Sequence, residues 1–404
     1  MSKLSIRDIE LRNKRVFIRV DFNVPLSEDG SIITDDTRIV ATLPTIEYAV
    51  RHHAKVILAS HLGRPKGKPN PKYSLRPVVD RLRELLDKHI GDSINVAFAP
   101  DCVGEIAEEM SRQLESRQVL LLENLRFHAE EEANDPEFSK KLASLAEVYC
   151  NDAFGSGHRA HASTEGITHF LKPSVAGLLM EKEITYLGKA LEAPEKPFVA
   201  IIGGSKISGK IDVIQNLLDK VDTLVIVGGM AYTFYRSKGV ATGKSLVEED
   251  MIDLAKQTLE KAKTKGVELL LPVDNILADG FSNDAKTQPW DTSKDFPADW
   301  QGLDIGPKSV AAIEDVISRA RTIVWNGPAG VFEFPNFAKG TNAIARAVAA
   351  NKAATSIIGG GDSVSAINQA GVADQITHIS TGGGASLEFL EGKKLPGVEA
   401  LSDK

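Results

Sequence analysis

Short runs of apolar, often β-branched residues recur along the whole chain, and longer amphipathic segments separate them. In the first half the apolar runs read RVFIRVDF, KVILAS, NVAFAP, VLLLEN and EVYCNDAF. In the second half they read PFVAIIGG, TLVIVGG, ELLLPVDN, TIVWNGP, TSIIGGG and ITHIST. The segments 75–90, 253–266 and 340–351 space their apolar residues as a helix does. Buried strands that alternate with helices predict α/β domains, each a parallel sheet with helices on both faces.

The length of the chain, 404 residues, exceeds what one hydrophobic core usually organises, so two domains are expected. A long helical pattern at 172–197, bounded by Pro173 and Pro194, is the predicted division. A helix between two α/β domains is a natural hinge element. The acidic stretch AEEEAND, residues 129–135, is interpreted as a solvated loop.

Composition removes several classes of function. The net charge of −7 argues against a general nucleic-acid binder. Cys102 and Cys150 lack the spacing of a metal motif and are expected to be buried free thiols. The N-terminal segment is charged throughout, and no apolar run approaches the roughly 20 residues of a membrane helix. We therefore expect a cytoplasmic protein without a membrane partner.

Polar side chains follow the predicted strands of the first half at the points where the strands end. Residues 1–180 hold 14 arginines and 8 histidines, against 4 and 1 in the rest of the chain. Arginine binds carboxylate and phosphate through paired hydrogen bonds, and ligands of parallel sheets lie beyond the carboxyl ends of the strands. An anion-binding first half is therefore expected. Its candidate residues are Asp21, Asn23, Arg38, His61, Arg64, Arg126, His128, His158, Arg159 and His161.

Glycine runs follow the strands of the second half. Glycine lets backbone N–H groups approach a phosphate, and the start of the following helix favours negative charge. Asp362 lies inside one such run and could hold Mg²⁺, which prefers carboxylate and phosphate oxygens. The second half is therefore expected to bind a nucleotide. The endings contain Lys206, Lys210, Asn326, Glu333, Gly359–Gly361, Asp362, Ser363 and Thr381–Ala385.

Two other classes of protein remain open on these residues alone. Gly204, Gly209 and Lys210 match the phosphate-loop pattern G-x-x-x-x-G-K, but Ile211 stands where a phosphate-loop NTPase needs Ser or Thr for magnesium. The stretch GVATGKS at 239–245 ends in a similar triplet, but its first glycine is too close and no strand precedes it. A non-catalytic binding protein that closes on an anion would explain the cations of the first half, but not Asp362 in a glycine loop.

Nine segments, in this order and over nearly the full length, carry a resemblance to one family. They are RVDFNVP, SHLGRP, ENLRF, NDAFGSGHRAHAS, GGSKISGK, GLDIGP, WNGPAGVFE, GGGDS and STGGGASLEFLEGK. On these segments the chain resembles the phosphoglycerate kinase family from end to end. Departures are small: Gly209 replaces a side chain that many relatives carry, and Ser363 replaces a threonine.

The resemblance implies a reversible phosphoryl transfer from 1,3-bisphosphoglycerate to MgADP, which gives 3-phosphoglycerate and MgATP in glycolysis. It implies a monomer of two doubly wound, Rossmann-like parallel-sheet domains joined by a hinge helix. The glycerate-binding domain is expected at residues 1–178 together with 390–404, and the nucleotide-binding domain at 179–389. Magnesium enters as the metal of the nucleotide.

The family's functional residues map onto this sequence by motif. Arg38 and Lys206 are the expected catalytic residues, as the main cations facing the transferred group, and Asp362 is the expected magnesium ligand. The implied glycerate site consists of Asp21, Phe22, Asn23, Arg38, His61, Leu62, Gly63, Arg64, Arg126, His158 and Arg159. The implied nucleotide site consists of Lys206, Lys210, Gly302, Asn326, Glu333, Gly360, Gly361, Asp362 and Ser363.

The acyl phosphate substrate is already activated, so no nucleophile from the protein is expected. Direct in-line transfer needs positioning and neutralisation of the three phosphoryl oxygens. The two sites are implied to lie on separate domains, so closure of the domains is expected to bring them together and to exclude water.

Overall fold

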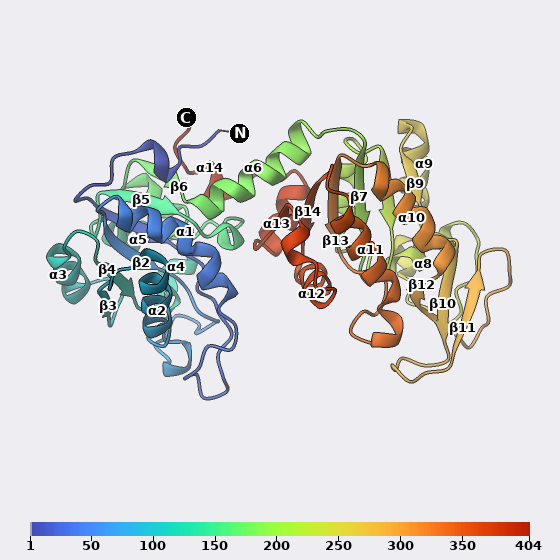
Figure 1. Ribbon diagram of the computed structural model, residues 1–404, viewed down its shortest axis with the longest axis horizontal. Coiled ribbons are helices and arrows are strands. Elements are labelled where there is room, and N and C mark those ends of the chain that lie inside the picture. Colours follow the sequence, from blue (N-terminus) through green and yellow to red (C-terminus); the bar gives the residue numbers. More distant parts are fainter. Residues whose placement is uncertain (1) are drawn as a thin grey trace. The chain divides into compact units, whose positions relative to one another are not determined.

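The computed structural model describes residues 2–404 (Figure 1). The chain forms two compact units. The first ends at Thr185 and regains the C-terminal segment Lys394–Lys404, and the second is Tyr186–Lys393. The sequence placed the two boundaries at 178/179 and 389/390. The structural boundaries lie a few residues later: the first falls within helix α6 (Leu178–Glu192), and the second falls between Lys393 and Lys394.

The first unit is built on a six-stranded sheet in the order β3-β4-β2-β1-β5-β6, and every neighbouring pair is parallel. Alternate side chains such as Val16 and Ile18 share one buried core with helices α1 and α2, while Phe17 faces Tyr149 on the other side. Both faces of the sheet are therefore buried, as the continuous apolar runs predict. The strands are β1 (Arg15–Arg19), β2 (Lys55–Ala59), β3 (Val96–Ala99), β4 (Val119–Leu122), β5 (Val148–Asn151) and β6 (Ser174–Ala176).

The second unit repeats this plan in a sheet of order β15-β14-β13-β7-β8-β9, again parallel throughout. The two parallel six-stranded sheets with flanking helices confirm the predicted α/β class (Figure 1). Helices α10, α11 and α12 pack on one face through residues such as Ile313, Ile344 and Ile367. The strands are β7 (Phe198–Ile202), β8 (Thr223–Ile226), β9 (Glu268–Leu270), β13 (Thr322–Asn326), β14 (Thr355–Gly359) and β15 (His378–Ile379).

A small antiparallel sheet in the second unit was not predicted. It has the order β11-β10-β12, and its strands are β10 (Asp274–Ala278), β11 (Thr287–Asp291) and β12 (Gln301–Ile305). The run ELLLPVDN read as one strand, but it contains β9 and the start of β10. The sheet packs Leu277 and Trp290 against Tyr232 and Tyr235 of helix α8. Strand β11 contains Pro289, and β11 and β12 lack the continuous apolar run that marks the parallel strands.

The helices are set by local sequence signals as well as by their apolar faces. The predicted segments 75–90, 253–266 and 340–351 correspond to α2, α9 and α11. Asp135 caps α5, because its carboxylate accepts a hydrogen bond from Phe138 N at 2.8 Å, and proline follows at the first helical position. The helices of the first unit are α1 (Thr37–Arg51), α2 (Val78–Ile90), α3 (Glu105–Gln113), α4 (Ala129–Glu132), α5 (Pro136–Ala143) and α14 (Pro396–Glu399).

The second unit contains seven further helices after α6 in the described part of the chain. Within residues 2–404, no helix combines the length and the apolar composition that crossing a bilayer requires. The helices are α7 (Ile211–Leu217), α8 (Met230–Ser237), α9 (Ile252–Lys265), α10 (Pro307–Arg319), α11 (Lys339–Ala350), α12 (Gly361–Gln369) and α13 (Gly384–Leu390).

The long helical pattern predicted for 172–197 is shorter in the structure. Residues Ser174–Ala176 form the edge strand β6, which pairs with β5, and the helix begins only at Leu178. All three residues of β6 are buried at this edge of the sheet. The predicted helix therefore exists, but its first turns are a strand.

The acidic stretch 129–135 is only partly the solvated loop that the sequence predicted. Residues Ala129–Glu132 form helix α4, and Glu131 is fully buried, whereas its neighbours Glu130 and Glu132 are exposed. Its carboxylate accepts hydrogen bonds from Ser163 N at 3.0 Å and from Ser163 Oγ at 2.5 Å. Ser163 Oγ in turn accepts a hydrogen bond from Arg19 Nε at 2.9 Å, and Arg19 is also fully buried. Glu131 thus supplies the counter-charge for a buried guanidinium, which the acidic composition of the stretch concealed.

We expect Glu131→Ala to lower the free energy of unfolding by about 3–5 kcal/mol, because it leaves the Arg19 charge buried without its counter-charge. Urea unfolding followed by circular dichroism measures the change. Glu130→Ala is the matched control, since Glu130 is the exposed neighbour in the same helix, and its effect should stay within about 0.5 kcal/mol. Equal losses for the two variants would contradict the role of Glu131.

Candidate active site

The sheet topologies predict where each unit binds a ligand. In the first unit the strand order reverses at β1, which lies between β2 and β5. In the second unit it reverses between β7 and β13. Ligands of open α/β sheets bind beyond the carboxyl ends of the strands at such a reversal. The loops after these strands hold most of the site residues predicted from the sequence.

Arg38 and Asp21 form a pair in the first unit. Arg38 lies in the first turn of α1, and its Nη1 donates to Asp21 Oδ2 at 2.5 Å. The Arg38 side chain is 42% exposed, whereas that of Asp21 is 13% exposed. Asp21 Oδ1 also accepts a hydrogen bond from Asn23 N at 3.2 Å. The loop after β1 therefore orients a guanidinium that stays open to a ligand.

His61 is held by a second, buried arginine that the sequence analysis missed. Arg19 Nη2 lies 3.1 Å from His61 Nδ1, and both side chains are buried. Because a guanidinium only donates, Nδ1 must accept, and the ring proton resides on Nε2. Burial, followed by the charges of Arg19, Arg126 and Arg38, holds the pKa of His61 well below its usual range. His61 is thus a neutral donor at physiological pH.

The loop after β2 is fixed by backbone contacts. Gly63 N donates to Asn23 Oδ1 at 2.9 Å, and Arg126 Nη1 donates to Gly63 O at 3.0 Å. Gly63 has φ +61°, and a Cβ there would lie 2.4 Å from the Tyr73 ring, so only glycine fits. Leu62 is buried, and its N donates to Asn124 Oδ1 at 3.2 Å. The predicted residues Asn23, Leu62, Gly63 and Arg126 therefore form one hydrogen-bonded assembly.

The remaining cations of the first unit gather around this assembly. Burial, followed by the charges of Arg126, Arg19 and Arg159, lowers the pKa of His161 to about 4. Arg159 Nε donates to His158 Nε2 at 3.2 Å. Arg64 and Arg159 are exposed, and Phe22 is buried with its N donating to Ser60 Oγ at 2.9 Å. The structure thus concentrates positive charge at the carboxyl ends of the strands, with Phe22 as part of the framework.

One feature of the sequence could have revealed Arg19 as a site residue. Arg19 is a charged residue at the end of the otherwise apolar strand β1, and it is fully buried. Fully buried arginines are rare unless they are paired. Its partners Ser163 and His61 lie in loops distant in sequence, so the pairing itself could not be read from the chain.

The second unit contains two adjoining cavities. The larger, of about 470 Å³, has walls of apolar and glycine residues that include Leu246, Phe281, Leu303 and Phe334. The predicted residues Gly302, Glu333 and Asp362 also line it. The smaller, of about 290 Å³, is lined by Lys210, Asn326, Gly360, Gly361, Asp362 and Ser363, together with glycines of the 382–384 run. Asp362 lines both cavities, so an apolar pocket and a glycine-rich pocket share one carboxylate.

Lys210 is held inside the smaller cavity. Its ammonium donates to Asn326 Oδ1, and Asn326 is buried at the end of β13. Burial lowers the pKa of Lys210 to about 8, and the Asp362 carboxylate opposes that shift. A bound phosphate would raise this pKa again and keep the lysine charged. The position suits a cation that grips a phosphate.

The glycine positions of this unit have two different structural reasons. Gly360 has φ +89° and precedes α12, and the residues at the start of this helix line the smaller cavity. At Gly302, a Cβ would lie 1.6 Å from Tyr232 Oη, so glycine is required by the wall of the larger cavity. Ser363 is buried, and its hydroxyl accepts a hydrogen bond from Gly327 N at 2.6 Å, which holds the turn after β13.

Lys206 differs from Lys210 in its setting. It is exposed in the loop between β7 and α7, and neither cavity has it among its lining residues. Ser208 in the same loop donates to Glu248 Oε1 at 2.5 Å. Glu333 is exposed at the rim of the larger cavity. The structure therefore places Lys206 in the solvent, free to reach a ligand.

The residues at Asp362 fit a magnesium ion that accompanies a nucleotide. Asp362 is an exposed carboxylate in the first turn of α12, beside glycine amides and Lys210. Magnesium usually keeps several waters and takes one or two carboxylates plus phosphate oxygens. A single open carboxylate next to a phosphate-sized, glycine-lined pocket satisfies that requirement.

Two parallel α/β units, one with converging arginines and one with glycine-lined cavities, define a two-domain phosphotransferase. A model of the family "Phosphoglycerate kinase" matches residues 6–393. The phosphoglycerate kinase of Acidobacterium capsulatum is 74% identical over 404 residues, and that of Koribacter versatilis is 66% identical, each over the full length of both chains. The structure of phosphoglycerate kinase from Coxiella burnetii superposes with a TM-score of 0.89 at 43% identity and covers 98% of both chains. The chain belongs to the phosphoglycerate kinase family.

The family assignment confirms the resemblance found in the sequence. Members of this family are kinases that act on a carboxyl group, and their reaction is the reversible phosphoryl transfer of glycolysis between 1,3-bisphosphoglycerate and ADP. They use nucleotide substrates, generally with Mg²⁺. The phosphate-loop NTPase and the non-catalytic binding protein are thereby excluded as the class of this chain.

Proposed function

We propose that the first unit binds the glycerate substrate, that the second binds MgADP, and that the phosphoryl group passes directly from one to the other. The observation that carries the proposal is Asp362, which lines both an apolar cavity and a glycine-lined cavity. A nucleotide has a flat aromatic base, whose faces pack against apolar side chains, and a charged phosphate tail, which matches this pair of cavities. The concentration of arginine and histidine in the first unit matches the phosphate and carboxylate of a phosphoglycerate.

In this mechanism the side chains position and neutralise, and none of them becomes covalently attached. His61 donates its Nε2 proton as a hydrogen bond, while Asp21 holds Arg38 in place. Arg38 and Lys206 neutralise the oxygens of the transferred group, and Lys210 and the glycine amides hold the nucleotide phosphates. Magnesium on Asp362 would supply charge neutralisation at the nucleotide phosphates when it is bound.

The test is the formation of ATP from ADP and 1,3-bisphosphoglycerate, measured with a coupled assay. We expect ATP formation that depends on both substrates and on Mg²⁺. Hydrolysis of ATP without a glycerate substrate, or binding of the ligands without turnover, would contradict the proposal. The protein is expected to be cytoplasmic and to act as a monomer. Gel filtration with light scattering tests the monomeric state.

We expect Asp362→Ala to weaken Mg-nucleotide binding by about 10–100-fold or more. Losing a residue that only hydrogen-bonds to a metal ligand already has an effect of this size. Isothermal titration with ADP in the presence of Mg²⁺ measures it. Asp374→Ala is the control, because Asp374 is an exposed aspartate after α12 and outside both cavities. An unchanged affinity for Asp362→Ala would remove this residue from the metal site.

Ligands bound on two units can react only if they are brought together, so the proposal includes closure of the two units. Small-angle scattering with MgADP and 3-phosphoglycerate together should give a smaller radius of gyration than the free protein. Each ligand alone serves as a control, since the full change should need both. An unchanged radius of gyration would argue against closure. The identity of the substrates would then still be tested by the assay of ATP formation.

A further inference from the structure

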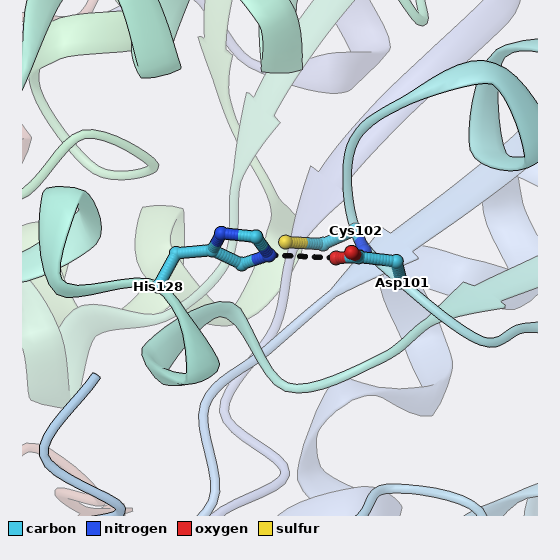
Figure 2. A group of neighbouring side chains, drawn as sticks. All are labelled: Asp101, Cys102 and His128. Carbon is cyan, nitrogen blue, oxygen red and sulfur yellow. Dashed lines mark hydrogen bonds and ion pairs between the residues drawn. The ribbon is translucent and has the colours of Figure 1, made fainter. Parts of the chain in front are cut away.

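Asp101, Cys102 and His128 form a cluster outside the glycerate and nucleotide sites that the resemblance implies, although His128 belonged to the wider set of anion-binding candidates. One potential ligand atom from each lies within 4.8 Å of the other two. Figure 2 shows the three side chains pointing toward one another, with the His128 ring facing the Asp101 carboxylate and the Cys102 sulfur beside them. His128 Nε2 lies 2.7 Å from Asp101 Oδ1. A carboxylate oxygen, a thiol sulfur and an imidazole nitrogen, each a possible metal ligand, thus lie close together.

Two separate parts of the first unit build this cluster. Asp101 and Cys102 follow β3, and His128 lies between the short helix Leu125–Phe127 and α4. The His128 ring is also positioned by Phe138 of α5, with ring centroids 5.2 Å apart. Because β3 and β4 are neighbours in the sheet, their following loops come together at its edge. The spacing of the cysteines in the sequence could not reveal this arrangement.

The surroundings of the cluster favour a cation. Cys102 is fully buried, whereas the side chains of His128 and Asp101 are 27% and 49% exposed, so an ion could enter from their side. The carboxylates of Asp101 and Glu131 act electrostatically on the Cys102 thiol, and Glu130 acts on His128, where Lys141 opposes it. Asp101 and Glu130 therefore supply negative charge around the donors, opposed by Lys141, while Glu131 is already paired with Arg19 through Ser163.

We propose that Asp101, Cys102 and His128 form a Zn²⁺-binding site with water as the fourth ligand. Zinc is bound tetrahedrally by thiolate, imidazole and carboxylate, and three protein ligands with one open position is a common arrangement. The thiol proton leaves to solvent when the sulfur binds the metal, and His128 gives up its Nε2 proton to solvent, so that the ring binds as a neutral imidazole protonated on Nδ1. Two bonds to zinc then replace the His128–Asp101 hydrogen bond. A thiolate and an imidazole select zinc over the hard ion Mg²⁺.

The site is tested by titrating the metal-free full-length protein with Co²⁺, which reports a bound thiolate through a charge-transfer absorption band, and then displacing it with Zn²⁺. We expect one equivalent of Co²⁺ to produce the band, Zn²⁺ to abolish it, and excess Mg²⁺ to leave it in place. The variant Cys102→Ser should remove the band. His128→Gln should weaken Zn²⁺ binding by at least about 10–100-fold in isothermal titration.

Matched variants separate this site from other thiols and histidines. Cys150→Ala should keep the band, because Cys150 is the other buried free cysteine and lies in β5. His169→Gln should bind Zn²⁺ like the unmodified protein, since His169 is likewise paired with a carboxylate, at 2.6 Å from Glu165. Circular dichroism checks that each variant folds. If Cys102→Ser does not fold, the Zn²⁺ affinity of His128→Gln decides the outcome.

A protein that gives no thiolate band, or a band that survives in Cys102→Ser, would overturn the proposal. The same conclusion follows if Zn²⁺ affinity is unchanged in His128→Gln, because the cluster would then be an ion pair beside a buried thiol. Binding is measured without substrates, so these outcomes do not depend on the assignment of the glycerate and nucleotide sites.

Discussion

Replacing Arg38 with alanine should reduce turnover by about 10²–10⁴-fold, the loss caused by removing a strong electrostatic donor from a transition state. The reason lies in the geometry of the loop after β1. Asp21 holds the guanidinium at 2.5 Å, and the Arg38 side chain remains 42% exposed toward a ligand. MgADP binding should be nearly unchanged, because the nucleotide cavities belong to the other unit. Steady-state kinetics and isothermal titration measure the two effects.

Arg83→Ala is the matched control for this variant. Arg83 lies in α2 of the same unit, is also 42% exposed, and is also paired with an aspartate, Asp80, at 2.8 Å. Its removal should leave turnover unchanged. Arg38→Lys should recover only part of the activity, because lysine keeps the charge but not the planar fork. If Arg38→Ala remains within tenfold of the unmodified protein, Arg38 is not a main cation of the transition state.

The sequence predicted those parts of the fold that produce local patterns of apolar residues. The apolar runs gave every strand of the two parallel sheets except the short edge strand β6, and residues 75–90, 253–266 and 340–351 gave helices. The antiparallel sheet was missed because β11 and β12 contain few apolar residues, and what buries Trp290 is its packing on α8. Such packing is decided between segments and leaves no period in the sequence.

The same distinction holds for the site. Strand endings pointed to Asp21, Arg38 and Asp362, because the carboxyl edge of a parallel sheet gathers whatever follows its strands. Glu131 was misread, because its environment is made by Ser163 and Arg19 from other parts of the chain. Burial and ion pairing between distant residues are tertiary properties, so composition assigned this carboxylate to the surface.

Lys206 lies in the loop GGSKISGK, and Lys206→Ala should lower kcat by about 10²–10⁴-fold. Lys206 is exposed, so its removal should cost little stability, and the loss should appear in kcat more than in KM for ADP if it acts only in the transition state. Lys244→Ala is the control, because Lys244 is an exposed lysine of the similar triplet at 243–245 and pairs with Asp299 at 3.1 Å. Its turnover should be unchanged.

A substitution at Gly209 tests whether the lysine of this loop acts on the phosphate, as proposed, or whether its backbone does, as in a phosphate loop. A phosphate loop needs its second glycine, because the backbone must approach the ligand closely. At Gly209 a Cβ would have nothing within 4 Å, and its φ lies outside the left-handed range, so alanine fits without strain. Gly209→Ala should therefore stay within about threefold of the unmodified turnover, far from the loss at Lys206. If Gly209→Ala proved as damaging as Lys206→Ala, the backbone of this loop, rather than its lysine, would hold the phosphate.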